Sequence, residues 1–210
     1  TALYDEVRAL GERVHDERYA LALGRLGDAQ VEQGDLDAAC ASYERAYESL
    51  GDWYDWSRRS AAMYASRRGE LERRRGDPDA ALEAFRLALD RLRAPDEERL
   101  EVLADVAWLH SMIGNLLLAA DRSREALAHH WAALSLRQWI EREGAAIEEG
   151  VALSLTHVGD PLVAIGLGRQ ARAALVAAYA RRLATSMPPL EKQRALRALR
   201  IRMLLALLRG

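Results

Sequence analysis

The chain has 210 residues, of which 50% are hydrophobic and 30% charged, and its 30 Lys and Arg nearly balance its 32 Asp and Glu. Its single cysteine excludes a disulfide scaffold, and charge-free stretches such as Met203 to Leu208 are far shorter than the ~20 residues of a membrane-spanning helix. We therefore expect a cytoplasmic protein with no membrane partner.

A fourfold internal repeat organises the sequence. Glycines recur at intervals of 42, 45 and 45 residues, and each is followed at fixed distances by a helix-breaking residue, an alanine, a bulky residue and a second alanine. The repeated glycines are Gly27, Gly69, Gly114 and Gly159, and the bulky residues are Tyr43, Phe85, His130 and Leu175. Because small residues let two helix axes approach closely, we expect each bulky side chain to fill the space beside its glycine.

Each repeat predicts a helix, a tight turn and a second helix. Asp35 and Asp77 are placed to cap the second helices of the first two repeats, and Pro78 stands at a first helical position, where its missing N–H costs nothing. Runs of alternating β-branched residues are absent from the sequence, so we predict an all-α fold. In chain order, we expect a trailing half repeat over 1–14, whole repeats over 15–52, 53–94, 95–143 and 144–188, and the leading helix of a fifth repeat, or a cap, over 189–210.

Both ends of the sequence match parts of a repeat. Ala2 and Ala9 are spaced like the two alanines of a second helix, and Gly210 follows Gly166 by 44 residues. We therefore expect about ten helices, and a fragment of a longer signalling or regulatory protein of bacterial type.

The pattern resembles the tetratricopeptide repeat family, in the segments RLGDAQVEQGDLDAACASYERAY and RRGELERRRGDPDAALEAFRLAL. The family's usual repeat is about 34 residues, so periods of 42 to 45 imply longer helices, similar to those of kinesin light chain and the Leu-Gly-Asn adaptors. The resemblance implies one domain over 1–210, a right-handed α-solenoid of antiparallel helix pairs.

In that family the first helices line a concave groove, which the resemblance carries to nine residues of this sequence: Asp28, Glu70, Asn115, Asp160, Ser66, Ser111, Thr156, Arg73 and Arg74. Trp108 is a tenth candidate, kept as the exception to the expectation that aromatic residues at helical spacing belong to the core. Three of the four residues that follow the repeat glycines are acidic, so we expect a protein or peptide partner that carries basic residues. The alternative is that these acids simply solvate the inner surface.

No familiar reactive motif occurs in the sequence: there is no glycine-rich phosphate loop, no His-Glu-x-x-His, no cysteine pair and no Gly-x-Ser-x-Gly. His110 and His130 occupy positions that pack together within one repeat, so we expect them to face each other as a hydrogen-bonded pair. Two histidines are too few for a zinc site. We expect no enzymatic activity, no catalytic residue, no cofactor and no metal.

The sequence therefore favours a non-catalytic scaffold that binds a protein or peptide. Two alternatives stay open: a ligand-responsive sensor or regulatory arm of a larger signalling protein, and a module that self-associates through the apolar stretch Met203 to Leu208. Residues 181–210 carry eight basic side chains and one acidic one, spaced at helical intervals among Leu and Ala. This spacing is typical of a solvated helix face, and we expect no nucleic-acid partner.

Overall fold

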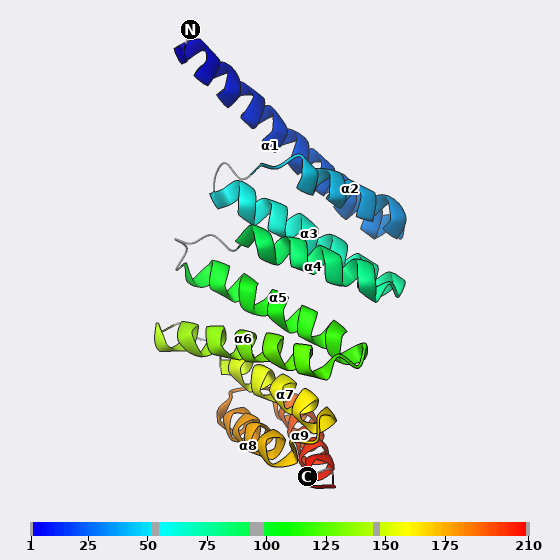
Figure 1. Cartoon of the computed structure of the whole chain (residues 1–210), viewed down its shortest axis with the longest axis vertical. Helices are drawn as coiled ribbons and strands as arrows, with labels where there is room; N and C mark the ends of the chain where they lie inside the picture. The colour runs from blue at the N-terminus through cyan, green and yellow to red at the C-terminus, as the bar shows by residue number, and fades with distance from the viewer. Residues whose placement is uncertain (1, 52–54, 93–98, 145–147, 209–210) are drawn as a thin grey trace. The chain divides into compact units, whose positions relative to one another are not determined.

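The computed structural model describes residues 2–51, 55–92, 99–144 and 148–208, with side chains over 16–51, 56–92, 99–144 and 150–208. These described residues form nine α-helices and no strand, which confirms the predicted all-α class (Figure 1). The chain divides into two compact units, residues 1–96 and 97–210, which we call unit 1 and unit 2.

Unit 1 contains α1 (Ala2–Gln33), α2 (Leu36–Glu48), α3 (Asp55–Arg75) and α4 (Pro78–Leu92), and each helix packs against the next. The first helix is continuous over its 32 residues. The boundary predicted between residues 14 and 15 therefore lies inside a helix, and the half repeat at 1–14 has no helix of its own. Glycine lowers helix propensity by only about 1 kcal/mol, and no proline interrupts residues 2–33, so nothing stops the helix there.

Unit 2 contains α5 (Leu100–Ala119), α6 (Ser123–Arg142), α7 (Glu148–Ala164), α8 (Gly168–Ala184) and α9 (Pro189–Leu208). Each helix again packs against the next, and α7 also contacts both α5 and α9. The first helices of successive pairs therefore come together on one side, which we call the inner side of unit 2.

The pairing of glycine and bulky residue is confirmed in all four repeats. A Cβ atom added at Gly27 would lie 2.7 Å from the Tyr43 ring, and one at Gly69 would lie 2.8 Å from the Phe85 ring. In unit 2, a Cβ atom added at Gly114 would lie 2.6 Å from the His130 ring, and one added at Gly159 would lie 2.8 Å from the Leu175 side chain. The missing side chain thus makes the space that the opposite helix fills.

The turn between the helices of a pair has the same form in every repeat. Gly34, Gly76 and Gly166 have φ near +80°, and Asp121 takes the same left-handed region with φ of +57°. In the first repeat the N–H of Gly34 donates to the Val31 carbonyl and that of Asp35 to the Gln30 carbonyl, which is the Schellman arrangement. The left-handed residue ends the first helix and satisfies its last carbonyls.

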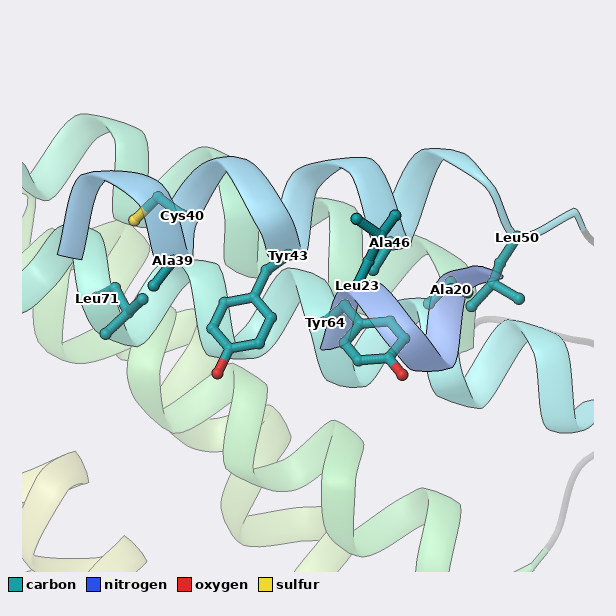
Figure 2. Packing of buried hydrophobic residues seen from close by; sticks show 10 residues of the cluster. Ala20, Leu23, Ala39, Cys40, Tyr43, Ala46, Leu50, Tyr64 and Leu71 are labelled. Carbon is teal, nitrogen blue, oxygen red and sulfur yellow. The ribbon is translucent and has the colours of Figure 1, made fainter. Parts of the chain in front are cut away.

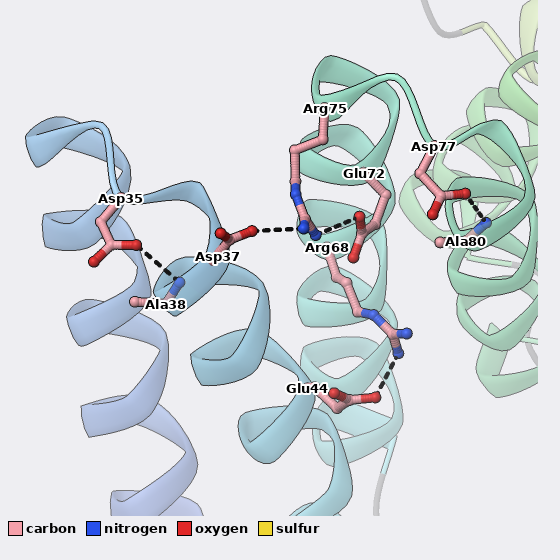
Figure 3. A network of polar contacts seen from close by, with 9 residues as sticks. All are labelled: Asp35, Asp37, Ala38, Glu44, Arg68, Glu72, Arg75, Asp77 and Ala80. Atoms are coloured by element: carbon pink, nitrogen blue, oxygen red, sulfur yellow. Dashed lines mark hydrogen bonds and ion pairs between the residues drawn. The ribbon is translucent and has the colours of Figure 1, made fainter.

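The predicted caps are also confirmed. Asp35 accepts a hydrogen bond from the Ala38 N–H at 3.1 Å, and Asp77 accepts one from the Ala80 N–H at 3.0 Å (Figure 3). Figure 3 also shows that Arg75 of α3 joins Asp37 of α2, at 2.5 Å. Water screens exposed ion pairs of this kind, so they orient α2 on α3 more than they stabilise it.

One core cluster of unit 1 lies between α1, α2 and α3 (Figure 2). Tyr43 and Tyr64 stack there with their ring centroids 6.3 Å apart. Cys40 is buried in the same cluster, and burial raises the pKa of its thiol to about 11. A thiol that stays protonated at neutral pH packs as a small apolar side chain.

Among the described helices, only α5 is long and apolar enough to cross a membrane by length and composition. It packs against α6, also contacts α7, and buries Val102, Leu109 and Ile113, which have exposed fractions of 2% or less. The core helix of a soluble protein passes the same test, so this feature is weak evidence for a span.

Candidate functional site

The first predicted acid, Asp28 of α1, is held by two side chains. The Tyr43 hydroxyl donates to its Oδ1 at 2.6 Å, and Arg67 of α3 forms an ion pair with the same oxygen. Burial acts to raise the pKa of Asp28, but these hydrogen bonds and the charge of Arg67 outweigh it and keep the pKa below its usual value. Asp28 is thus an ionised acceptor that already has a cationic partner.

The second predicted acid, Glu70, pairs with Arg73 one turn later in α3, with Oε2 and Nη2 2.9 Å apart. Ser66 lies one turn earlier and donates its hydroxyl hydrogen to the Ala62 carbonyl at 2.7 Å. Arg74 is exposed at the end of the same helix. This stretch of α3 therefore presents both charge signs.

In unit 2, Asp160 of α7 accepts a hydrogen bond from the Arg202 Nε of α9 at 2.9 Å. Burial raises the pKa of Asp160, and the charge of Arg202 opposes that rise. Asn115 is exposed on α5, and Trp108 is half-buried on the same helix. All three predicted acids therefore have arginine partners within the chain, which the sequence pattern did not show.

The predicted hydroxyl residues of unit 2 are buried. Ser111 and Thr156 have exposed fractions of 2% and 7%, and each donates its hydroxyl hydrogen to the carbonyl one turn earlier in its helix, at 3.0 Å. This bond satisfies the donor and leaves the hydroxyl oxygen able to accept. In Ser111 that capacity is used.

The donor to Ser111 is Arg137 of α6, a residue that the sequence-based prediction missed. Its Nη1 donates to Ser111 Oγ of α5 at 3.0 Å and to Ser154 Oγ of α7. Arg137 is half-buried, and burial lowers the pKa of its guanidinium. The signal that could have found it is its register: the corresponding residues of the first two repeats are Leu50 and Leu92, both buried.

The histidines pair differently from the prediction. His110 of α5 meets His129, with their Nδ1 atoms 2.9 Å apart, and His130 meets His157 of α7, with ring centroids 5.2 Å apart. The expected pair of His110 and His130 is therefore wrong. The reason is that His130 points at Gly114. His129, which is turned by about 100° from His130 on the same helix, therefore meets His110.

Within the described part of the chain, no group of three or more His, Cys, Asp or Glu is arranged to hold a metal ion. Burial, reinforced by neighbouring charges, lowers the pKa of both His130 and His157 to about 4. Both imidazoles are thus neutral at pH 7. The charged group that joins α5, α6 and α7 here is Arg137, through Ser111 and Ser154.

Comparisons with known proteins agree with this geometry. The family model described as tetratricopeptide repeat matches residues 20–49. These residues run from the middle of α1 to the end of α2, and they contain the first glycine and its bulky partner. No curated protein sequence matches the chain.

Several solved structures have a similar fold. BtubC from P. vanneervenii has a TM-score of 0.68 and 18% identity, over 100% of this chain and 88% of that one. The apo form of RapI has a TM-score of 0.70 and 14% identity, over 98% of this chain and 56% of that one. The yeast histone chaperone Hif1 has a TM-score of 0.70 and 12% identity, over 92% of this chain and 97% of that one. Residues 20–49 thus form a tetratricopeptide repeat, and the chain has the fold of tetratricopeptide-repeat proteins.

Proposed function

We propose that this chain is a non-catalytic scaffold of the cytoplasm that binds a protein or peptide along its first helices. The observation that carries the proposal is the inner side of unit 2, where α7 contacts both α5 and α9 and the exposed Asn115 and the half-buried Asp160 lie on neighbouring helices. Amide and carboxylate groups along adjacent helices suit the N–H and C=O groups of an extended peptide.

The similarity to Hif1 supports an interaction role in general terms. That protein is described as a scaffold that recruits protein complexes to core histones. Only the fold carries over at 12% identity, because binding residues vary among proteins that share a fold.

A basic residue of the binding partner would have to take the place of an arginine that already pairs with an acid of this chain. Asp28 is paired with Arg67, and Asp160 with Arg202, so each acid already has a cation. A Lys or Arg of the binding partner would replace one of these arginines and preserve the charge balance. Because exchange of one exposed ion pair for another changes the free energy little, basic residues would act mainly on selectivity and association rate.

Site-specific cross-linking tests the proposed surface. The chain would carry the photo-reactive amino acid p-benzoylphenylalanine either at Asn115, exposed on α5, or at Ala128, exposed on α6. We expect illumination of cells that express the two variants to trap a partner at position 115 and much less at position 128. Equal trapping at both positions, or trapping at 128 alone, would contradict binding along the first helices.

Self-association through α9 is a second candidate, favoured by a specific observation. The last turns of α9 expose Ile201, Leu204, Leu205, Leu207 and Leu208, with exposed fractions between 47% and 82%. Leu204 also stands at the register of the repeat glycine, where the other repeats leave room for a second helix. An apolar face of this kind is typical of a contact surface.

Sedimentation velocity at increasing protein concentration tests this candidate. We expect the mass of the chain to rise with concentration, and the variant Leu204→Glu to stay monomeric, because a buried carboxylate at the contact is costly. A mass that does not change between micromolar and millimolar protein would exclude the self-associating module.

A further inference from the structure

Arg137 is a half-buried cation with spare hydrogen-bonding capacity. Its Nη1 group donates to two serine hydroxyls, one on α5 and one on α7. A guanidinium has five N–H donors, so three remain on Nε and Nη2, and these make no hydrogen bond among the described residues. Nε and Nη2 together form the fork that binds a carboxylate through two parallel hydrogen bonds.

No acid of the described chain neutralises this cation. Ion pairs among the described residues of unit 2 include those of Arg122 with Glu125, Arg181 with Glu141 and Arg202 with Asp160. Arg137 has no such partner among the residues whose side chains are described, and burial lowers the pKa of its guanidinium. The nearby rings of His130 and His157 are neutral at pH 7, so they neither supply nor cancel charge.

The repeat shows that an arginine is not needed here for packing. Leu50 of the first repeat and Leu92 of the second occupy the same register and are buried, with exposed fractions of 3% and 6%. Ser154 likewise takes the register of Tyr64, which is buried in unit 1. Leu50 and Tyr64 of unit 1 thus correspond to a polar, hydrogen-bonded pair in unit 2. The polar pair costs more free energy to bury.

In unit 1, the corresponding junction of α1, α2 and α3 borders an opening. A pocket of about 260 Å³ is lined there by Leu21, Leu50 and Tyr64, among others. The corresponding residues of unit 2 are Trp108, Arg137 and Ser154. Trp108 and Arg137 are both half-buried, so they keep some access to solvent.

We propose that Arg137 binds a carboxylate of the partner peptide, an Asp or Glu side chain, at the junction of α5, α6 and α7. The serine hydroxyls of Ser111 and Ser154 hold Nη1 and aim the free edge of the guanidinium at the ligand. This inference rests on the proposed function and adds the chemical class of one partner residue. It is independent of the acids of α1, α3 and α7, which face basic groups.

Peptide binding with defined probes tests the proposal. The probes are fluorescein-labelled hexaglutamate amide and hexaglutamine amide, measured by fluorescence anisotropy at low ionic strength. We expect the chain to bind hexaglutamate at least tenfold more tightly than hexaglutamine. Arg137→Leu should lose at least tenfold in affinity for hexaglutamate while keeping its helicity, because leucine is the residue of the first two repeats.

Arg124→Leu is the matched control, since Arg124 is exposed near the start of the same helix, about 20 Å from position 137. Its affinity should stay within twofold. Arg137→Gln, which keeps most of the side-chain length, provides a second neutral variant should the leucine alter folding. Equal losses in the Arg124 and Arg137 variants, or no loss at Arg137, would overturn the proposal.

Two further arms separate the possible outcomes. Labelled hexaalanine with a free or an amidated C-terminus reports whether a terminal carboxylate binds instead of a side chain, and tighter binding of the free acid would overturn the side-chain assignment. If a partner is trapped at position 115 but hexaglutamate binding ignores Arg137, the scaffold function stands and this inference fails. If trapping at position 115 fails while Arg137 still selects hexaglutamate, Arg137 is a carboxylate site and the contact surface proposed around position 115 is wrong.

Discussion

Phe85→Ala is expected to lower the free energy of unfolding of unit 1 by about 3–5 kcal/mol, the usual cost of removing a buried aromatic ring. Phe85 is fully buried, and its ring fills the space that Gly69 leaves on α3. The flanking residues Ala81 and Ala88 are too small to close the resulting cavity. Urea denaturation followed by circular dichroism at 222 nm measures the change.

Phe85→Leu is the matched control, because Leu175 occupies this position in the fourth repeat and is also fully buried. It should cost about 1–1.5 kcal/mol, well below the alanine variant. A loss under about 1 kcal/mol for Phe85→Ala would show that α3 and α4 move together and fill the space. In that event the contact between glycine and ring would not be what spaces the two helices.

The stability of unit 2 is expected to fall as the pH is lowered from 7 towards 4. His130 has a pKa of about 4 in the folded chain and about 6.5 when unfolded, so the unfolded chain binds the proton first. The stability that the neutral ring contributes is therefore complete above pH 6.5 and is lost between pH 6.5 and 4. At about 1.4 kcal/mol for each pH unit, this histidine accounts for about 3 kcal/mol.

The physical cause is the surroundings of the ring. Both nitrogens of His130 are buried without a hydrogen-bond partner among the described residues, so an added proton gains no acceptor. His157, with a pKa also near 4, acts in the same direction. Urea denaturation at pH 7.5, 6 and 5 measures the slope, and His130→Leu, which carries the residue of the fourth repeat, should flatten it. A wild-type profile that is level over this range would refute the expected protonation.

The repeat pattern was enough to predict the helix pairs and their contacts. Glycine and bulky residue recur with constant spacing, and α-helical geometry leaves one way for them to meet, as Gly27 with Tyr43 and Gly159 with Leu175. The turn was equally predictable, because it depends on one glycine or aspartate with positive φ, followed in the first two repeats by a capping aspartate. The length of α1 was not, since nothing in residues 1–14 marks where one helix should end.

The candidate site was predicted less well. Asp28 and Asp160 were expected to face a ligand, yet Arg67 and Arg202 reach them from helices that lie 39 and 42 residues further along the chain. The histidine pairs differ for a similar reason. Side-chain pairing between helices depends on rotamers and on how the helices are rotated about their axes, which the repeat spacing does not specify.

By itself, the sequence determined the all-α class, the order of the repeats, the glycine contacts and the turns, because these depend on short spacings and on the conformational limits of single residues. Only the tertiary structure decided which charges are neutralised and which remain. Arg137 is one of many arginines in the sequence, and it becomes distinctive when α5 and α7 bring two serine hydroxyls to one of its nitrogens, while no carboxylate among the described side chains pairs with the others. The electrostatic character of a residue is set by its neighbours in space, and α-helices of separate repeats supply those neighbours.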